Sequence, residues 1–363
     1  MQVFCFIRHS HSGWTIIQLT HNSFDDGGYD LNANGYVVWQ GYDGSDYEIF
    51  LYDGTKTTQI TDNSYDDIAP RINDNGYVVW QGYDGSDYEI FLYDGSNTTR
   101  ITDNGYYDES PGINNNGHVV WYGQDHNYGL DSEIYLYDGS SITQITDTSS
   151  SDWFPMINDD DYVVWMGGGS YNQIHAYDGS SITEITKSPF NNLSFQINNN
   201  GYITWCGRTS PSSKYQIFLY DGISTTIISQ SSYDNYSPHI NDEGHIVWHG
   251  YYGDYNIFLY DGTSTIKISD NFFVALAPRI NSKGDVVWYG SPSFRSDYEI
   301  YLYDGSSVTQ FTDNSYDDLD PIINDSSYIV WRGSDGNDYE IFLAKPTPPM
   351  KKAMPWLPLL LDD

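Results

Sequence analysis

The sequence predicts an all-β fold, an eight-bladed β-propeller made of four-stranded antiparallel blades. The first observation behind this prediction is a tryptophan that ends a strand-like stretch, YVVW or a variant of it, eight times along the chain. Successive tryptophans are 40 to 44 residues apart, which is the length of a four-stranded propeller blade. The second is that each period contains four short strand patterns separated by turn residues, while no stretch shows sustained helical periodicity. The eight residues are Trp39, Trp80, Trp121, Trp165, Trp205, Trp248, Trp288 and Trp331.

The second repeat shows the four predicted strands in order, here lettered A to D from the propeller axis outward. They read APRIN, YVVW, YEIFLY and TTRIT, at residues 69–73, 77–80, 88–93 and 98–102. Between the first two strands, Asp74-Asn75-Gly76 is a tight-hairpin signal, because Asn-Gly tolerates the positive φ angles of a type I′ turn. Asp94-Gly95 gives the same signal between the third and fourth strands.

The two ends of the repeat region predict how the ring closes. The last strand C reads YEIFLA at residues 339–344, and the chain then leaves into KPTPPMKK without a fourth strand. The missing strand matches TIIQLTHN at residues 15–22, so we expect the N-terminal segment to complete the eighth blade and cover its edge. The predicted organisation is an N-terminal extension (1–14), the propeller (15–345), and a Pro-rich linker with a short apolar tail (346–363). The tail is expected either to dock on a partner or neighbouring subunit, or to be a frayed end.

The repeat unit INDNGYVVWQGYDGSDYEIFLYDGSNTTRITDN, followed by a proline, resembles the TolB-type, WD-repeat-like propeller family. The resemblance covers nearly the whole chain, and it departs from the family in two places. Asn-Asp-Asn-Gly replaces the usual Ser-Pro-Asp-Gly turn, and strand B ends in Trp where the family has Phe. Such repeats also form the propellers of dipeptidyl-peptidase-like enzymes, in which a separate hydrolase domain does the chemistry. Because the sequence shows no such domain, we expect that activity not to carry over.

Composition limits the possible partners. The chain has 15 Lys and Arg against 50 Asp and Glu, a formal charge of −35, which repels nucleic acid and anionic membranes and attracts cations or basic partners. The simpler alternative is that this acidity keeps a Tyr-rich surface soluble. Two cysteines, Cys5 and Cys206, form neither a disulfide framework nor a metal cluster. No apolar run is long enough to span a bilayer, and the first residues do not have the architecture of a signal peptide.

The loops between strands B and C and between strands D and A emerge on one face and vary from blade to blade. They predict a crescent of acids and tyrosines over blades eight, one, two and three. The gap over blades four and five lacks this pattern, with GGSYNQ at 168–173, RTSPSSKYQ at 208–216 and KSPFNN at 187–192. The predicted contact residues are Tyr42, Asp43, Asp46, Tyr65, Asp66, Asp67, Tyr83, Asp84, Asp87, Tyr316, Asp317, Asp318, Asp335 and Asp338.

Three interpretations of this crescent stay open. Tyrosines beside carboxylates suit a glycan or a basic protein ligand, because Tyr offers a large contact area with a polar tip. Clustered oxygens suit calcium, for which Asp43, Asp46, Asp66 and Asp67 are the candidates, although the spacing is not that of an EF-hand. In the third interpretation, Glu89 and its equivalents satisfy local backbone donors and the aspartates only form turns.

Catalytic alternatives are weaker. His239, His245 and His249 fall within one hairpin and are weak metal candidates. No serine-nucleophile, phosphate-binding or paired-cysteine motif is present. We therefore expect a non-enzymatic recognition module for a protein or glycan, which requires no cofactor, has calcium as a possible ligand and works outside the cytoplasm. The alternatives are a carbohydrate-active enzyme using the mouth of the central channel, and a structural surface that self-associates.

Overall fold

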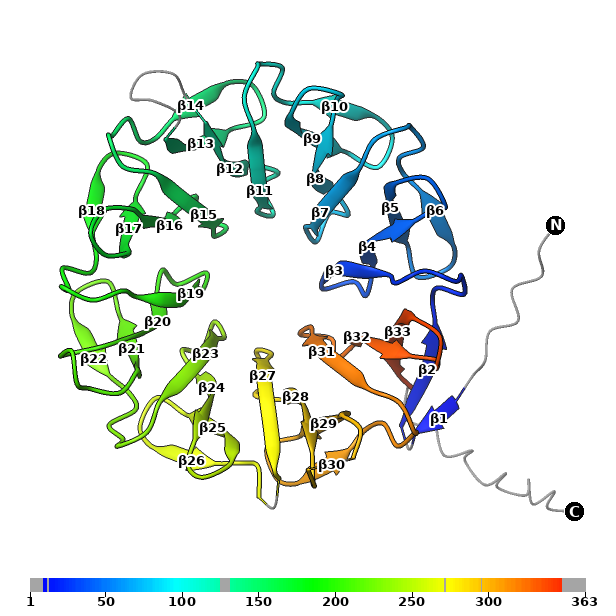
Figure 1. The fold of residues 1–363 in the computed structure, drawn as a ribbon, viewed down its shortest axis with the longest axis vertical. Coiled ribbons are helices and arrows are strands. Elements are labelled where there is room, and N and C mark those ends of the chain that lie inside the picture. Colours follow the sequence, from blue (N-terminus) through cyan, green and yellow to red (C-terminus); the bar gives the residue numbers. More distant parts are fainter. Residues whose placement is uncertain (1–8, 12, 125–130, 271, 295, 348–363) are drawn as a thin grey trace, which may run out of the picture.

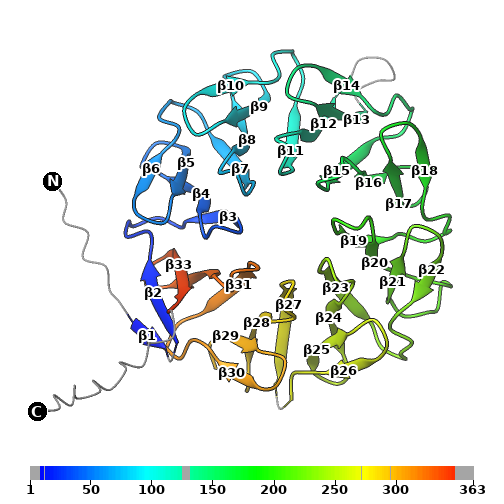
Figure 2. The same ribbon diagram turned by 180° about the vertical axis from the view of Figure 1, so that it is seen from behind.

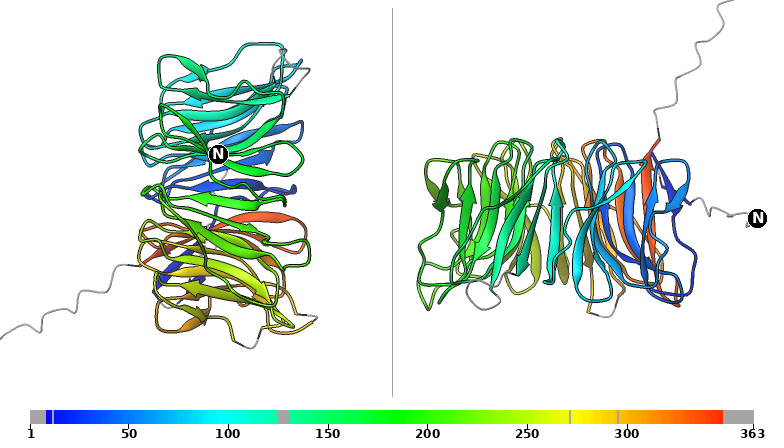
Figure 3. Two further views of the ribbon diagram at one scale, coloured as in Figure 1. Left: turned by 90° about the vertical axis from the view of Figure 1, so that its left-hand side faces the viewer. Right: turned by 90° about the horizontal axis from the view of Figure 1, so that it is seen from above.

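The computed structural model describes residues 9–11, 13–124, 131–270, 272–294 and 296–347. These residues form eight antiparallel sheets arranged around a central opening, as Figure 1 and the reverse view in Figure 2 show. The views along the disc in Figure 3 show that the strands of each blade run from one face to the other. The predicted eight-bladed, all-β architecture is confirmed. In the described part of the chain there is no helix of a length and apolarity that would cross a membrane.

Each blade has four strands, and we number the blades by their tryptophans along the chain. The innermost strands (A) are β3 (Gly27–Leu31), β7 (Asp67–Ile72), β11 (Asp108–Ile113), β15 (Asp152–Ile157), β19 (Leu193–Ile197), β23 (Asn235–Ile240), β27 (Val274–Ile280) and β31 (Asp318–Ile323). The B strands are β4 (Val37–Tyr42), β8 (Val78–Tyr83), β12 (Val119–Gln124), β16 (Val163–Gly167), β20 (Ile203–Gly207), β24 (Ile246–Tyr251), β28 (Val286–Ser291) and β32 (Ile329–Ser334).

The outer half of each blade completes the sheet. The C strands are β5 (Tyr47–Tyr52), β9 (Tyr88–Tyr93), β13 (Ser132–Tyr137), β17 (Gln173–Tyr177), β21 (Gln216–Tyr220), β25 (Tyr255–Tyr260), β29 (Glu299–Tyr303) and β33 (Tyr339–Pro346). The D strands are β6 (Thr57–Gln59), β10 (Thr98–Arg100), β14 (Ile142–Gln144), β18 (Ile182–Glu184), β22 (Thr225–Ile227), β26 (Thr265–Lys267), β30 (Val308–Gln310) and, for the eighth blade, β2 (Trp14–Gln18).

Ring closure follows the prediction. Strand β2 pairs antiparallel with β33, with Ile17 opposite Leu343 and Gln18 opposite Phe342. The short strand β1 (His9–His11) adds to the outer side of β2. Ile17 is buried in the same cluster as Trp39 of the first blade, so the N-terminal segment joins the last blade to the first.

The core lies between neighbouring blades, because both faces of each sheet are covered. Val38 and Ile49 of the first blade pack against Val78 and Trp80 of the second, and similar clusters repeat around the ring. Trp80 is 1% exposed and stacks on Phe91 of the adjacent strand at 5.7 Å between ring centroids. Full burial of one such aliphatic side chain contributes about 1.5–3 kcal/mol, so the repeated apolar positions account for the ring's stability.

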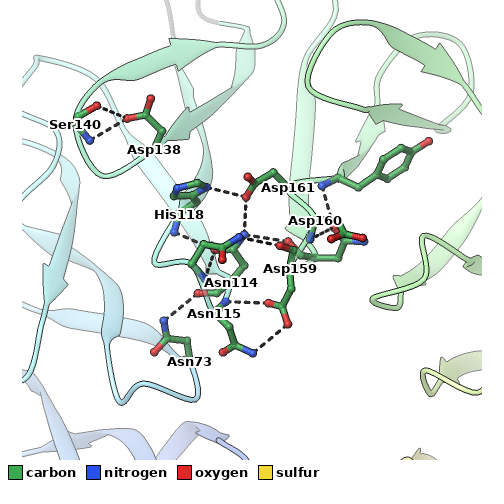
Figure 4. A network of polar contacts seen from close by, with 12 residues as sticks. Asn73, Asn114, Asn115, His118, Asp138, Ser140, Asp159, Asp160 and Asp161 are labelled. Atoms are coloured by element: carbon green, nitrogen blue, oxygen red, sulfur yellow. Dashed lines mark hydrogen bonds and ion pairs between the residues drawn. The ribbon is translucent and has the colours of Figure 1, made fainter.

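The turns between strands A and B carry a feature that the sequence analysis did not foresee. Each contains a buried asparagine whose Nδ2 donates to the backbone oxygen of the equivalent asparagine in the next blade. Figure 4 shows part of this ring, where Asn73 bonds to Asn114 at 2.9 Å. Asn324 closes the circle onto Asn32 at 2.7 Å. The eight members are Asn32, Asn73, Asn114, Asn158, Asn198, Asn241, Asn281 and Asn324.

The type I′ geometry predicted for these turns is wrong. In the second blade only Gly76 has a positive φ, +82°, and Asn75 does not. The Gly76 amide donates to the Asn73 carbonyl, and the Asn73 side-chain oxygen accepts from the amides of Asn75 and Tyr77. The asparagine thus caps its own turn while its amide nitrogen reaches the neighbouring blade, and this side-chain capping is why a different turn forms.

Candidate functional site

The predicted acidic loops do lie together on one face. In the first blade, the Tyr47 amide of the B–C loop donates to the Asp66 carboxylate of the D–A loop at 3.0 Å. The Tyr83 amide of the second blade donates to the Asp66 backbone oxygen at 2.8 Å. Each D–A loop is therefore tied to the B–C loops on both sides of it, and the face is held rigidly by backbone contacts.

The acidic pairs of the D–A loops split into two roles. The first acid accepts a backbone amide, as Asp66 does, and as Asp317 does from Tyr298 at 2.9 Å. The second acid is buried, and in the second and eighth blades it accepts the indole N–H of its own blade's tryptophan, whereas Oδ1 of Asp26 in the first blade has no partner. Asp67 bonds to Trp80 at 2.7 Å, and Asp318 bonds to Trp331 at 2.9 Å. Asp67 and Asp318 are only 4% and 3% exposed, so the structure places these two predicted contact residues beneath the surface.

Burial changes the acidity of this second aspartate. It raises the pKa of Asp67 to about 7, with the hydrogen bonds from Trp80 and Asn63 opposing the shift. The same cause raises the pKa of Asp318 to about 6. The seventh blade departs from the pattern, because Ala275 occupies this place and the indole nitrogen of Trp288 is buried without a partner. These aspartates and their tryptophans therefore belong to the scaffold.

The tyrosines of the crescent are more accessible. Tyr65 and Tyr316 are 44% and 45% exposed, whereas Tyr42 and Tyr83 are half-buried. Tyr65 packs edge-on against Tyr83 with 5.7 Å between ring centroids. Together with Asp84 and neighbouring residues they line a groove of about 310 Å³ between the first and second blades.

The B–C loops hold the densest groups of acids. In three blades, two aspartates and a strand-C glutamate each offer an oxygen within 4.8 Å of the others. The groups are Asp43–Asp46–Glu48, Asp84–Asp87–Glu89 and Asp335–Asp338–Glu340. The glutamates were missing from the predicted contact residues, although each stands two residues before the phenylalanine of its strand C in the internal repeat. The structure buries all three completely.

Some members of these groups also accept local backbone hydrogen bonds. In the first blade Asp43 accepts the amide of Ser45, and Glu48 accepts the amide of Asn63 at 2.7 Å. Glu89 accepts the amide of Asn104 in the same way, as the interpretation of these residues as acceptors for backbone donors predicted. Burial also raises the pKa of Glu340 to about 8, with Asp26 and Asp338 adding repulsion. In each group, residues that help to form the loop also bring three carboxylate oxygens within 4.8 Å of one another.

The blades of the predicted gap differ chemically at the same positions. Gln173 and Gln216 replace the buried glutamate in the fourth and fifth blades and still accept the equivalent backbone amides. Arg208 lies over the ring of Tyr215 at 4.1 Å, and Lys214 pairs with Asp234 at 2.9 Å. Among the described residues, the three groups of acids lie in the eighth, first and second blades.

The histidine candidates do not assemble into a metal site among the described residues. His239 lies on β23 and His249 on β24, but the cross-strand partner of His239 is Val247 and that of His249 is Tyr236. His245 precedes β24, in the turn. Burial lowers the pKa of His239 to about 3 and that of His249 to about 4. Burial likewise raises the pKa of the fully buried Cys206 thiol to about 12, which removes it as a nucleophile, while Cys5 lies outside the described residues.

Several solved structures are similar to this fold. The β-propeller domain of the Trilobed protease from Pyrococcus furiosus matches 80% of this chain over 99% of its own length, with 15% identity and a TM-score of 0.55. Porphyromonas gingivalis dipeptidyl peptidase 4 matches 84% of the chain at 11% identity and a TM-score of 0.59. Pyrococcus horikoshii acylaminoacyl peptidase matches 84% at 15% identity and a TM-score of 0.53. The chain spans 57% of the length of each of these two peptidases.

These likenesses establish the β-propeller fold, since the identities are low. Among protein-family models and curated proteins, nothing matches the sequence. The comparison nevertheless corrects the functional prediction. We expected a non-enzymatic recognition module; the similar propellers are those of peptidases, which contradicts this expectation. The alternatives of a carbohydrate-active enzyme and of a self-assembling surface find no counterpart in these three structures either.

Proposed function

We propose that this chain is the propeller of a peptidase and that it admits peptide substrates to a catalytic unit carried by another domain or subunit. The observation that carries the proposal is the extent of the structural match. The chain corresponds to essentially all of one protease propeller domain and to just over half of complete peptidase chains. We include in this proposal the assignment of the repeat to the TolB type, which rests on the sequence motif of the repeat unit.

The innermost strands are the surface that we propose an extended chain contacts. They form a ring about the propeller axis (Figure 1), and each carries a residue with positive φ or a register shift that interrupts its pairing with strand B. Phe154, at this place in β15, has a φ of 54° and is 56% exposed. Arg332 of the eighth blade pairs with Asp320 of its innermost strand at 2.9 Å. The inner wall therefore offers both apolar and charged groups to a passing peptide.

Charge favours basic peptides. A formal charge of −35 attracts cationic chains over several ångströms at moderate salt, and the attraction weakens as salt screens it. Folded proteins are expected to be excluded because an extended chain alone can thread a ring of strands. The proposal thus names unfolded or short peptides, with basic side chains preferred, as the substrates.

A photo-cross-linking experiment tests this proposal. A basic oligopeptide carrying a benzophenone side chain is irradiated with the full chain, and the cross-linked sites are mapped by mass spectrometry. We expect saturable cross-links on the innermost strands, which decrease several-fold in Phe154→Ala. The matched control, Ile223→Ala, alters a residue that is 92% exposed on an outer turn and should leave the yield unchanged.

Two outcomes contradict the proposal. One is cross-linking spread evenly over inner and outer strands, or absent at millimolar peptide. The other is equal labelling by a folded basic protein that carries the same benzophenone group, because a passage for extended chains must discriminate against it.

A further inference from the structure

The carboxylate groups of the B–C loops contain buried oxygens that nothing satisfies. In the first blade, Oδ1 of Asp46 and Oε2 of Glu48 are buried without a hydrogen-bond partner. In the eighth blade, both carboxylate oxygens of Asp338 and Oε2 of Glu340 are in the same condition. Glu48 and Glu340 are fully buried, and Asp46 and Asp338 are 7% and 9% exposed. Buried carboxylates without partners are costly unless a positive charge compensates them.

In the second blade the equivalent oxygens, Oδ1 of Asp87 and Oε2 of Glu89, are also buried without a hydrogen-bond partner, but a cation of the chain contacts other oxygens of the group. There the guanidinium of Arg100 lies 2.8 Å from Asp84 Oδ2 and 2.8 Å from Glu89 Oε1. The same Nη2 atom also lies 2.9 Å from Asp103. One cation supplied by the chain therefore joins the aspartate and the glutamate that belong to this carboxylate group.

The first and eighth blades lack that arginine at the equivalent place. Arg100 on β10 pairs with Phe91 of the neighbouring strand C. In the same register, Gln59 pairs with Phe50 in the first blade and Gln18 pairs with Phe342 in the eighth. Glutamine is neutral, so two of the three carboxylate groups have no cation from the corresponding position of strand D.

We propose that the carboxylate groups Asp43–Asp46–Glu48 and Asp335–Asp338–Glu340 each bind a calcium ion, and that Arg100 takes the place of this ion in the second blade. The inference is independent of the proposed peptidase role. It keeps Asp43 and Asp46 of the calcium candidates predicted from the sequence, and it replaces Asp66 and Asp67, which accept a backbone amide and an indole, by Glu48.

The chemistry of the groups fits calcium. All ligands are hard oxygens, which calcium prefers, and the loop that carries them has a glycine with a φ of +111° at Gly44 and +98° at Gly336, so the aspartates on either side can fold back toward one strand. Calcium accepts six to eight oxygens in flexible geometry, so backbone oxygens and water can complete its shell. Magnesium demands a strict octahedron and is expected to bind more weakly.

The test measures bound calcium on the full chain after treatment with a chelator. Equilibrium dialysis against calcium chloride gives the stoichiometry, with dissociation constants expected on the order of 10⁻⁵–10⁻³ M. A thermal melt with calcium and with chelator gives a second readout, and we expect calcium to raise the unfolding temperature. Magnesium at the same concentration should have a smaller effect.

Variants at one strand position make the test specific. Arg100→Gln removes the internal cation and should raise the number of bound calcium ions by one. Gln59→Arg introduces that cation into the first blade and should lower the number by one. The matched control is Thr58→Arg, which adds the same charge to the same exposed strand at the neighbouring residue, whose side chain points to the opposite face. It should leave the stoichiometry unchanged.

The proposal is overturned if no calcium is retained and the melts with calcium and chelator coincide. It is equally overturned if Gln59→Arg and Thr58→Arg change the bound calcium alike, because binding would then follow general charge. Gln59→Arg removes no contact of the scaffold, so this variant keeps the test decisive if Arg100→Gln does not fold.

Discussion

His249 illustrates how a single buried group can govern acid stability. It lies between the rings of Tyr236 and Tyr255, and its Nδ1 is buried without a partner. Burial lowers its pKa from 6.5 to about 4 in the folded chain. In the unfolded chain this histidine is protonated below about pH 6.5, whereas in the folded chain it stays neutral down to about pH 4. Stability is full above this range and is lost as the pH falls through it.

His249→Gln is expected to remove this sensitivity. The first and second blades have Gln at the same place, where Gln40 accepts the amide of Ala69 and Gln81 that of Ser110 in the next blade. Between pH 7 and pH 5 the wild type should lose about 2 kcal/mol more than the variant, from the depressed pKa of one histidine. Chemical denaturation at both pH values measures the difference. Equal losses in the two proteins would show that His249 does not titrate as the burial requires.

The adjacent acids of the D–A loops show why the sequence alone did not separate surface residues from buried ones. Asp66 and Asp67 are adjacent and chemically identical, so the sequence analysis gave both to the contact surface. The structure separates them, because Asp66 ends the loop whereas Asp67 begins β7 and points to the buried side. One signal could have distinguished them: the second acid always precedes its tryptophan by 13 residues, as Asp108 precedes Trp121. A fixed distance to a core residue indicates a scaffold contact.

At the scale of the element, the A–B turns depend on their asparagines. Asn198 donates to the Asn241 carbonyl of the next blade at 2.8 Å and accepts the amides of Asn200 and Tyr202. We expect Asn198→Ala to destabilise the chain by about 1–3 kcal/mol, because a buried carbonyl and two amides lose their partner. Asn200→Ala in the same turn removes one exposed bond to Asp242 and should cost less than about 0.5 kcal/mol. Denaturant unfolding compares the two; similar losses would mean that the asparagine ring contributes nothing special.

The strands themselves were predictable because each carries its own local signal. YEIFLY at 88–93 coincides with β9, and TTRIT begins where β10 begins. The asparagine ring was not predictable in this way, since its bonds join residues 40 or more positions apart and exist only once the blades are placed side by side. The carboxylate groups are intermediate. Their aspartates were predicted contact residues and Glu48 was not; the structure brings an oxygen of each within 4.8 Å of the others, with Asp46 and Glu48 buried and Asp43 exposed.

At the scale of the whole molecule, the scaffold contacts are nearly the same in every blade, whereas the acidic loops differ between blades. We expect function to depend on the loops that differ. The scaffold contacts repeat in all blades: the amide of an isoleucine on strand C bonds to a Thr or Ser hydroxyl at 2.7–2.9 Å, from Ile49 in the first blade to Ile341 in the eighth. The carboxylate groups occur in three adjacent blades. The uniform part explains the fold, and the varying part concentrates carboxylates in three adjacent blades.

Closure of the ring depends on strand β2, which leads to a final prediction. Deleting residues 1–22 removes the partner of β33 and leaves a row of unpaired backbone groups at the edge of the eighth blade. Burial of Ile16, Ile17 and Leu19 is lost as well, so we expect a lower unfolding temperature and self-association that increases with concentration. Truncation after Thr347 serves as the control, since every strand of the described part is retained and the melt should not change. A deletion variant that melts like the full chain and stays monomeric in analytical ultracentrifugation would show that the eighth blade is stable with three strands, and that β2 does not hold the ring together.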